Sequence, residues 1–235
     1  MRYERQILME QIGIKGQEKL NQSTVVVVGC GGLGSPVLTY LASAGIGKLM
    51  IIDFDEVSES NLNRQFLYGA EDIGRPKVVC AKERLQDLNN EIEIVDFHEK
   101  ISAVNIGKFI DSADVVIDCV DNIETRILLG RACLSRNIPL VEAGVQGFYG
   151  WIMSIGVESA CLECMGFEHM KIPRPGPIIG TTAGVIGSLQ ANECIKIILG
   201  MKGTLFGTML QYDGINLSID SIELQKDNSC IAHRG

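Results

Sequence analysis

Short runs of apolar residues alternate along the first 145 residues with longer stretches in which apolar residues recur at helical spacing. The clearest run is TVVVV at residues 24–28, where consecutive β-branched residues are typical of a strand buried on both faces. Further strands are predicted at 49–54, 93–98, 114–119 and 139–143, and helices at 4–20, 36–44, 76–88, 105–112 and 124–136. Strands that alternate with helices predict a doubly wound, mostly parallel, Rossmann-like α/β sheet.

The pattern changes after Gly147. Residues 148–157 and 206–224 alternate apolar and polar positions, which predicts antiparallel strands that extend the sheet. A Pro/Gly-rich segment, KIPRPGPIIGTT, lies between them and precedes a helix predicted over 183–199, which Gly200 ends. We expect a single domain, residues 1–235. Its expected parts are an N-terminal helical segment (1–24), a first half (25–145) and a second half (146–235) with a crossover loop at about 165–183.

Composition narrows the class of protein. The net charge of −8 at pH 7 gives no overall basic surface of the kind that binds nucleic acid, so a nucleic-acid partner is not expected. No stretch approaches the roughly 18 apolar residues of a membrane span, and the charged N-terminus lacks the apolar core of a signal peptide. We therefore expect a cytoplasmic protein without a membrane partner. Five of the eight cysteines are expected to be small buried residues, namely Cys30, Cys80, Cys119, Cys133 and Cys194.

A glycine-rich motif, GCGGLG, follows the first predicted strand and precedes a helix. Its glycines are expected to let the backbone approach a phosphate, which the free N–H groups of the helix N-terminus would bind. These glycines are Gly29, Gly31, Gly32 and Gly34. Asp53 lies at the end of the next strand, where an acidic residue would contact a ribose. On this motif alone, an NAD(P) or flavin site is the more common interpretation.

A second group of polar residues favours chemistry at a nucleotide. Its members follow predicted strands or lie on the loop and helix between them, and such positions converge at one edge of a doubly wound sheet. They are Asp53, Asp55, Ser60, Asn61, Arg64, Gln65, Lys77, Asp121 and Asn122. A dehydrogenase does not cleave its pyrophosphate, whereas an enzyme that breaks a phosphoanhydride needs Arg, Lys and Mg²⁺ to stabilise the leaving group. Asp121 is the expected magnesium ligand.

Several segments together resemble the MoeB/ThiF/HesA family, the bacterial relatives of ubiquitin-activating enzymes. They cover nearly the whole chain and are YERQI, GCGGLGS, DFDEVSESNLNRQFLY, IGRPKV, DCVDN, CLEC and GVIGSLQANECIK. The resemblance implies an ATP-dependent adenylyltransferase that acts on the C-terminal Gly-Gly carboxylate of a ubiquitin-like sulfur carrier protein. The products would be an acyl adenylate and pyrophosphate, in a molybdopterin, thiamine or related sulfur-transfer pathway. The first half would then bind the nucleotide and the second half the carrier.

The resemblance also implies roles for individual residues. It matches Gly32 to the phosphate turn, Asp53 to the ribose contact, Asn61 and Arg64 to a phosphate-contacting pair, Lys77 to a phosphate lysine and Asp121 to the magnesium ligand. Arg5 matches an arginine that reaches ATP from the partner subunit of a homodimer. The expected catalytic residues are therefore Arg64, Lys77, Asp121 and Arg5. No side chain need act as nucleophile, because the substrate carboxylate is one.

The remaining cysteines form two-ligand pairs. Cys161 and Cys164 form a Cys-x-x-Cys pair, and Cys230 and His233 a Cys-x-x-His pair near the C-terminus. Four nitrogen or sulfur ligands suit tetrahedral Zn²⁺, so we expect a structural zinc clip that holds the tail. Family members often carry two Cys-x-x-Cys pairs, and histidine is the departure here. The alternatives are a thiol redox pair and a disordered, metal-free tail.

The crossover loop carries no cysteine, which puts a thioester intermediate at that position in doubt. We therefore expect the reaction to stop at the adenylate. Pro173, Pro175 and Pro177 predict a stiff segment, either a lid over the carrier tail or an exposed connection. Other functions considered are an ATP-dependent tRNA-base-modifying dehydratase of the same superfamily, an NAD(P)-dependent oxidoreductase and a non-catalytic carrier-binding scaffold.

Overall fold

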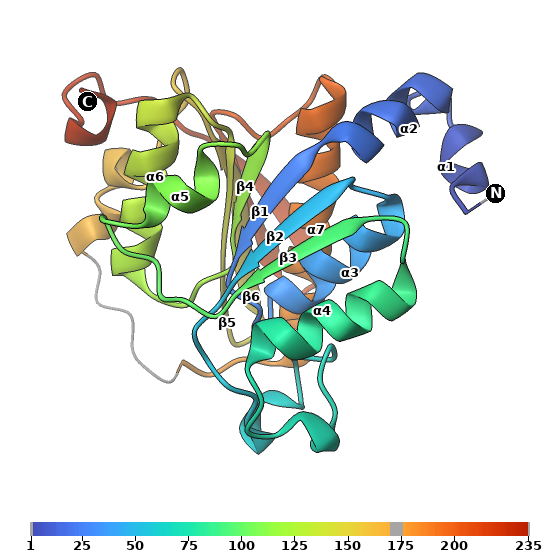
Figure 1. Cartoon of the computed structure of the whole chain (residues 1–235). Helices are drawn as coiled ribbons and strands as arrows, with labels where there is room; N and C mark the ends of the chain where they lie inside the picture. The colour runs from blue at the N-terminus through green and yellow to red at the C-terminus, as the bar shows by residue number, and fades with distance from the viewer. Residues whose placement is uncertain (1, 170–175, 235) are drawn as a thin grey trace.

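A computed structural model of the chain describes residues 2–169 and 176–234. Within these residues the apolar runs form one eight-stranded sheet with the strand order β3-β2-β1-β4-β5-β6-β7-β8 (Figure 1). The strands are β1 (Thr24–Val28), β2 (Lys48–Ile52), β3 (Glu93–Phe97), β4 (Val115–Asp118), β5 (Leu140–Gln146), β6 (Tyr149–Ile155), β7 (Thr208–Asp213) and β8 (Ser218–Glu223). The strands β3, β2, β1, β4 and β5 are parallel, and the pairs β5–β6, β6–β7 and β7–β8 are antiparallel. The α/β sheet with antiparallel extension is therefore confirmed.

Helices cover both faces of the sheet (Figure 1). They are α1 (Glu4–Ile7), α2 (Gly13–Gln22), α3 (Gly34–Ala44), α4 (Lys77–Leu88), α5 (Ile106–Ile110), α6 (Ile123–Arg136) and α7 (Gly180–Leu199). Short 3-10 helices are η1 (Glu59–Asn61), η2 (Ala70–Asp72), η3 (Glu163–Met165), η4 (Phe167–His169) and η5 (Ile231–His233). The helices α3, α4 and α7 lie against one face, and α5 and α6 against the other.

The central strands explain why two cores form. Alternate side chains of a strand point to opposite faces, so a continuous apolar run supplies both cores. In β1, Val25 and Val27 join the core under α3 and α7, whereas Val26 and Val28 join the core under α5 and α6. All four side chains are at most 3% exposed. The predicted buried cysteines also lie in these cores or beside them.

The predicted helix over residues 4–20 is wrong, because the segment forms two helices. The chain turns between α1 and α2, and Gly13 takes the left-handed backbone conformation with φ +58°. The turn lets Gln6 donate to the Gln17 side chain (2.7 Å) and to the Ala44 carbonyl (3.0 Å). One continuous helix would place those groups on different turns. Leu8, in the segment between α1 and α2, is 73% exposed.

Two other helices begin earlier than predicted. Helix α3 begins at Gly34 and α7 begins at Gly180, inside the segment that was expected to be the end of the crossover loop. Of that loop, residues 170–175 lie outside the described residues, and with them Pro173 and Pro175. The Pro177 carbonyl accepts a hydrogen bond from the Gly147 N–H at 2.7 Å, which ties the end of the loop to the β5–β6 turn.

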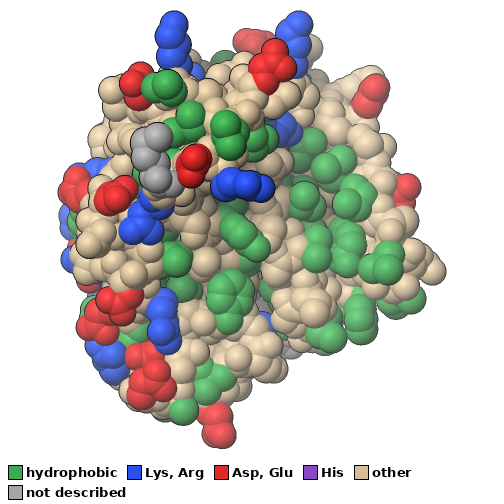
Figure 2. Space-filling model, turned by 90° about the vertical axis from the view of Figure 1, so that its right-hand side faces the viewer, with side chains coloured by type: hydrophobic (Ala, Val, Ile, Leu, Met, Phe, Trp, Pro, Cys, Tyr) green, Lys and Arg blue, Asp and Glu red, His purple; other side chains and the backbone are tan. Residues whose placement is uncertain are grey.

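The surface differs between regions. Figure 2 shows hydrophobic side chains gathered on one part of the face that lies to the right in Figure 1, while charged side chains are scattered mainly over its left and upper parts. Elements on this side expose large apolar residues such as Leu8, Ile14 and Tyr40, each more than half exposed. No helix in the described part of the chain is long and apolar enough to cross a membrane.

Candidate functional site

A cleft of about 890 Å³ lies at the carboxyl edge of the parallel strands. The strand order reverses between β1 and β4, and a crevice at this edge is where open α/β sheets bind nucleotides. The cleft is lined by ten predicted site residues: Gly29, Gly31, Gly32, Asp53, Asp55, Arg64, Gln65, Lys77, Asp121 and Asn122. Residues predicted from consecutive strand ends therefore share one cavity.

The glycine turn is shaped by close backbone contacts. Gly29 has φ +98°, and a Cβ there would lie 2.6 Å from the Cys119 carbonyl oxygen at the end of β4. A Cβ on Gly34 would lie 2.2 Å from the Gly29 carbonyl oxygen. Both positions therefore require glycine. Gly34 does not line the cleft, so its role is to close the turn, while Gly31 and Gly32 line the cleft before α3 begins.

Asp53, the residue that follows β2, supports this turn. Its carboxylate accepts hydrogen bonds from the Cys30 N–H at 2.7 Å and the Asp55 N–H at 2.8 Å. The buried Tyr68 hydroxyl donates to the Cys30 carbonyl at 2.6 Å. Hydrogen bonds therefore fix the peptide groups on both sides of Cys30. Burial raises the pKa of Asp53, and the positive charge of Lys77 opposes that rise. Asp53 was predicted to bind a nucleotide together with the glycine turn, and it lies directly beside that turn.

Lys77 lies inside the cleft, where an ion pair holds its ammonium group. Its side chain is only 6% exposed, and its Nζ lies 2.9 Å from an Asp55 carboxylate oxygen, which is half exposed. A buried ammonium needs a counter-charge. Asp55 provides this charge in the structure, and a nucleotide phosphate would compete for the same ammonium.

Arg64 reaches the cleft from the loop after η1. Its guanidinium donates to the Ser60 carbonyl at 2.8 Å and to the Asn63 side chain at 3.0 Å. A Cβ on Gly180 would lie 2.6 Å from the Asn63 carbonyl oxygen, so α7 begins in direct contact with this loop. The start of α7 therefore fixes the backbone that carries Arg64.

Gln65 is 4% exposed and lines the cleft. Its Oε1 is buried and has no hydrogen-bond partner among the described residues. Since buried polar atoms are nearly always paired, this oxygen is suited to accept from a bound ligand. Asn122 also lines the cleft, and it caps α6 by accepting from the Thr125 N–H at 2.9 Å.

Besides Gly34, three predicted nucleotide-site residues do not line the cleft. Asn61 is used inside η1, where its side chain accepts from the Ser58 N–H at 3.1 Å. The Ser60 hydroxyl lies 3.0 Å from that of Ser58. Arg5 is exposed on α1, whose Gln6 bonds to Ala44 at the end of α3 opposite the glycine turn. Within one chain Arg5 therefore lies away from the cleft.

The cleft is also lined by residues that the sequence analysis missed, among them Phe54, Lys100, Arg126, Trp151, Phe167 and Tyr212. Half of these six, Trp151, Phe167 and Tyr212, come from the second half, where strand alternation alone does not say which face lies against a ligand. Arg126 carried a signal that could have been used. It is a charged residue within an apolar helical segment, and its side chain is 6% exposed.

The predicted metal ligands come together as a second site, on the α6 side of the sheet. The ligand atoms of Cys161, Cys164, Cys230 and His233 all lie within 4.8 Å of one another. The Sγ of Cys161 is 3.6 Å from that of Cys164 and 3.7 Å from that of Cys230. Tetrahedral zinc with Zn–S bonds of about 2.3 Å would place its sulfur ligands about 3.8 Å apart. We call these four residues the cysteine cluster.

Two members of this cluster, His233 and Cys164, are shifted toward the protonation state that binds a metal, while burial raises the pKa of the Cys161 and Cys230 thiols. The His233 Nε2 is buried and lacks a hydrogen-bond partner among the described residues, and burial lowers the pKa of this histidine toward the neutral, ligating form. Burial acts to raise the pKa of Cys164, but hydrogen bonds to its sulfur, including one from the Asp227 N–H at 3.5 Å, hold that pKa below its usual value. The residues therefore fit a zinc ion.

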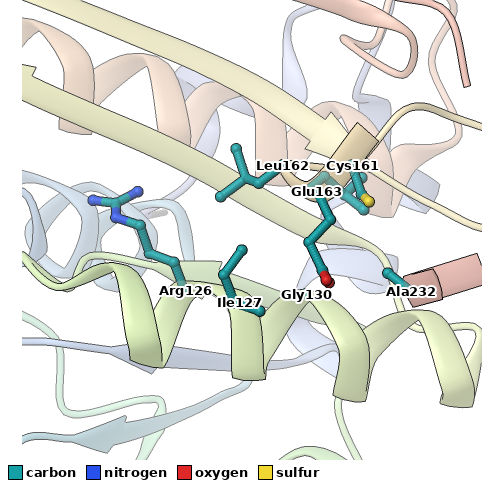
Figure 3. Close-up of a pocket in the computed structure, with 8 residues that line it drawn as sticks. Arg126, Ile127, Gly130, Cys161, Leu162, Glu163 and Ala232 are labelled. Atoms are coloured by element: carbon teal, nitrogen blue, oxygen red, sulfur yellow. The ribbon is translucent and has the colours of Figure 1, made fainter. Parts of the chain in front are cut away.

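A small pocket lies between the cysteine cluster and α6. Figure 3 shows Arg126, Ile127 and Gly130 on this helix facing the Cys161–Glu163 segment and Ala232. Arg131 of α6 donates to the Glu163 carboxylate at 2.9 Å. The guanidinium of Arg126 points away from this pocket (Figure 3), and Arg126 also lines the cleft.

The fold and the cleft define the chain as an α/β protein of the nucleotide-binding type, with a glycine turn, several basic side chains and acidic strand ends in one cavity. A model of the ThiF family matches residues 3–232, and the chain belongs to this family.

Individual relatives support the assignment. The chain is 38% identical to the sulfur carrier protein ThiS adenylyltransferase of Escherichia coli strain K12, over 98% of this chain and 93% of that one. It is 40% identical to adenylyltransferase and sulfurtransferase MOCS3 of Culex quinquefasciatus, over 98% of this chain and only 54% of that one. The chain thus spans about half the length of the MOCS3 relative. The E. coli MccB structure with MccA-N7isoASN shares the fold, with a TM-score of 0.87, 24% identity, and coverage of 99% of this chain and 75% of that one.

Proposed function

We propose that this chain adenylylates the C-terminal Gly-Gly carboxylate of a ubiquitin-like sulfur carrier protein, using ATP and releasing pyrophosphate. The observation that carries the proposal is the meeting of the glycine turn, Arg64, Lys77 and Asp121 in one cleft. An intact redox coenzyme would leave these charged groups without a purpose. The names of the ThiS adenylyltransferase of E. coli and the sulfur carrier protein adenylyltransferase of Thermus thermophilus support the same reaction.

The chemistry follows from charge. A carboxylate oxygen of the carrier attacks the α-phosphorus of ATP, a P–O bond forms, and the bond to the pyrophosphate oxygen breaks. Two anions approach each other, so cations must offset their repulsion. Lys77 would exchange Asp55 for phosphate, and Arg64 would exchange the Ser60 carbonyl for phosphate. The glycine turn and the N-terminus of α3 would hold the nucleotide in position.

Asp121 and the cysteine cluster are proposed to hold metals with different duties. Asp121 would bind Mg²⁺, which when present neutralises charge that builds on the pyrophosphate. The cysteine cluster would bind a structural Zn²⁺ through three thiolates and one imidazole. That ion would join η5 to the segment that begins at Cys161, and no chemical step passes through it.

A homodimer in the cytoplasm completes the proposal. Arg5 does not line the cleft of its own chain, so it would act in the cleft of a partner subunit. The exposed apolar side chains gathered on the face in Figure 2 support a contact with another protein surface. A second chain that brings Arg5 to the cleft would cover part of this apolar face.

Pyrophosphate exchange tests the proposal. The protein is incubated with ATP, Mg²⁺, labelled pyrophosphate and a panel of small ubiquitin-like proteins that end in Gly-Gly. We expect label to enter ATP with at least one carrier, and not with the same carrier lacking its last glycine. Tight binding of NADH without exchange would favour an oxidoreductase. Modification of a tRNA base without exchange would favour the dehydratase.

A further inference from the structure

A buried group of charges lies beneath the loop between β4 and α6. The carboxyl groups of Asp118 and Glu142 are fully buried, and both lie against the guanidinium of Arg126. Its Nη1 is 3.1 Å from Asp118 Oδ2 and 3.2 Å from Glu142 Oε2. The ring of Trp151 covers the guanidinium, with 5.6 Å between Arg126 Cζ and the ring centroid. We call Asp118, Arg126 and Glu142 the buried charge cluster.

This cluster fixes one residue of the loop from both sides. Nη2 of Arg126 donates to the Val120 carbonyl at 2.6 Å, and Asp118 Oδ1 accepts from the Val120 N–H at 2.7 Å. A further hydrogen bond joins Arg126 Nη1 to the Ala143 carbonyl of β5. The residue after Val120 is Asp121, which lines the cleft. The orientation of the peptide that leads into Asp121 is therefore set by Arg126 and Asp118.

The charges of the cluster require a proton. One guanidinium balances one carboxylate, and a second unpaired buried carboxylate would be very costly. Both Glu142 Oε1 and Asp118 Oδ2 lack a hydrogen-bond partner in the described part of the chain. Burial raises the pKa of Glu142 well above its usual value, and the neighbouring Asp118 carboxyl raises it further. A proton on Glu142 supplies a donor for the Asp118 carboxylate and leaves the cluster neutral.

We propose that Arg126 is a positioning residue, which acts with Asp118 and a neutral Glu142 to hold Asp121 in the orientation that binds Mg²⁺. The inference rests on the proposed function, because it takes Asp121 as the magnesium ligand. Groups that orient a metal ligand control metal affinity, and their loss typically weakens it by about 10- to 100-fold. A neutral cluster does so without placing extra charge beside the metal.

The test measures ATP binding by calorimetry at a series of Mg²⁺ concentrations, with no carrier present. Arg126→Lys keeps the positive charge but cannot donate to Val120, Ala143 and the carboxyl groups together, because an ammonium lacks the fork of a guanidinium. We expect the half-saturating Mg²⁺ concentration to rise about tenfold, with ATP affinity in the absence of Mg²⁺ within about twofold of wild type. Arg136→Met is the matched control, because Arg136 lies on the same helix and pairs with Asp111 at 2.6 Å.

Two further variants sharpen the result. Asp118→Asn is expected to behave like Arg126→Lys, whereas Glu142→Gln is expected to keep the wild-type Mg²⁺ dependence because glutamine imitates the neutral acid. In an Asp121→Asn background, Arg126→Lys should cause no further rise in the half-saturating Mg²⁺ concentration, since both changes act on one ligand.

Three outcomes would overturn the inference: a wild-type Mg²⁺ dependence of Arg126→Lys, an equal loss of ATP affinity with and without Mg²⁺, or additive effects with Asp121→Asn. A tenfold rise for Glu142→Gln would overturn the neutral state of that residue. If wild type binds Mg²⁺ and ATP but supports no exchange with any carrier, the proposed function fails while this inference is still decided by the binding data.

Discussion

The cleft and the cysteine cluster gather polar residues in opposite ways. In the cleft, Asp53 and Lys77 already have partners within the chain, because Asp53 bonds to backbone N–H groups and Lys77 pairs with Asp55. In the cysteine cluster, three sulfurs lie close together and the His233 nitrogen lacks a partner among the described residues. These side chains of the cleft therefore have partners even without a ligand. In the cysteine cluster, a bound ion would supply the partner that the side chains lack.

The two sites also differ in how the chain assembles them. The cleft takes its residues from the ends of successive strands of one sheet, and the sheet fixes their positions. The cysteine cluster joins segments 69 residues apart in sequence, Cys161 and Cys230, with η5 at the end of the chain. Damage to the cleft should therefore reduce the reaction with little change in stability, and damage to the cluster should do the reverse.

The largest effect is expected from Arg64→Ala. Removal of a cation that stabilises the charge of the transition state costs about 10²- to 10³-fold in rate. Pyrophosphate exchange at saturating ATP should fall by about that factor, while the free energy of unfolding changes by less than about 1 kcal/mol.

Arg84→Ala is the control for this change. Arg84 is exposed on α4 and does not line the cleft, so exchange should stay at the wild-type rate. An Arg64→Ala protein with full exchange would remove Arg64 from the reaction and with it the contrast between the two sites.

Loss of metal from the cysteine cluster should act on the fold. An ion that joins Cys161 to Cys230 closes a loop of 69 residues, and a cross-link of this size is worth about 4 kcal/mol in the loop-entropy model. His233→Ala should therefore lose zinc, measured by elemental analysis, and unfold at lower denaturant concentration. Exchange at a temperature where the variant stays folded should fall much less than for Arg64→Ala.

The matched control for the zinc prediction is His169→Ala. This histidine side chain is 84% exposed and lies outside the cluster. It should retain about one zinc per chain. A His233→Ala protein that keeps its metal would show that another residue supplies the fourth ligand. A wild-type protein whose stability is the same with and without metal would favour the metal-free tail.

A third test concerns pH and the buried charge cluster, which lies between the two sites. Glu142 faces Asp118 and Cys119 at the end of β4, and Arg126 and Cys133 on α6. Since its pKa is raised in the folded protein, the folded state holds a proton that the unfolded state loses above about pH 4.5. That contribution to stability is complete below this pH and declines as pH rises, by about 1.4 kcal/mol per pH unit until the folded pKa is reached.

Glu142→Gln removes this titration. The stability of wild type relative to this variant should therefore decline between about pH 5 and about pH 7, which denaturant unfolding of both proteins would reveal. Parallel stability curves would mean that Glu142 is ionised in the folded protein.

The same contrast explains what the sequence could predict. The strands, the mostly parallel sheet and the glycine turn follow from local signals, because a buried β-branched run and a G-x-G-x-x-G motif each have few structural solutions. The convergence of Asp53, Asp55 and Asp121 follows from the rule for strand ends. Cys161 and His233 could be paired only through the chemistry of zinc, since nothing local joins them.

What the sequence could not predict depends on contacts between distant segments. The contacts of Gln6 with Gln17 and Ala44 stabilise the break between α1 and α2, and periodicity does not reveal them. The place of Arg126 on α6 depends on Asp118 of β4 and Glu142 of β5, which lie outside its own helix. The use of Asn61 as a cap for η1 reflects competition between a ligand role and a local hydrogen bond, and sequence alone cannot decide it.

The smallest effect is expected where the cleft already has a partner for its cation. Asp55 is half exposed, so its pair with Lys77 is screened by water and should be worth no more than about 1 kcal/mol. Asp55→Asn frees the ammonium for phosphate, and the KM for ATP should fall by up to about fivefold. Asp96→Asn, which breaks the Lys82–Asp96 pair (2.7 Å) away from the cleft lining, should leave KM unchanged. A rise in KM for Asp55→Asn would mean that this carboxylate contacts the nucleotide or its metal directly. In that case Asp55 would add a contact to the bound ligand, as the side chains of the cysteine cluster would to an ion, and Lys77 would not simply exchange Asp55 for phosphate.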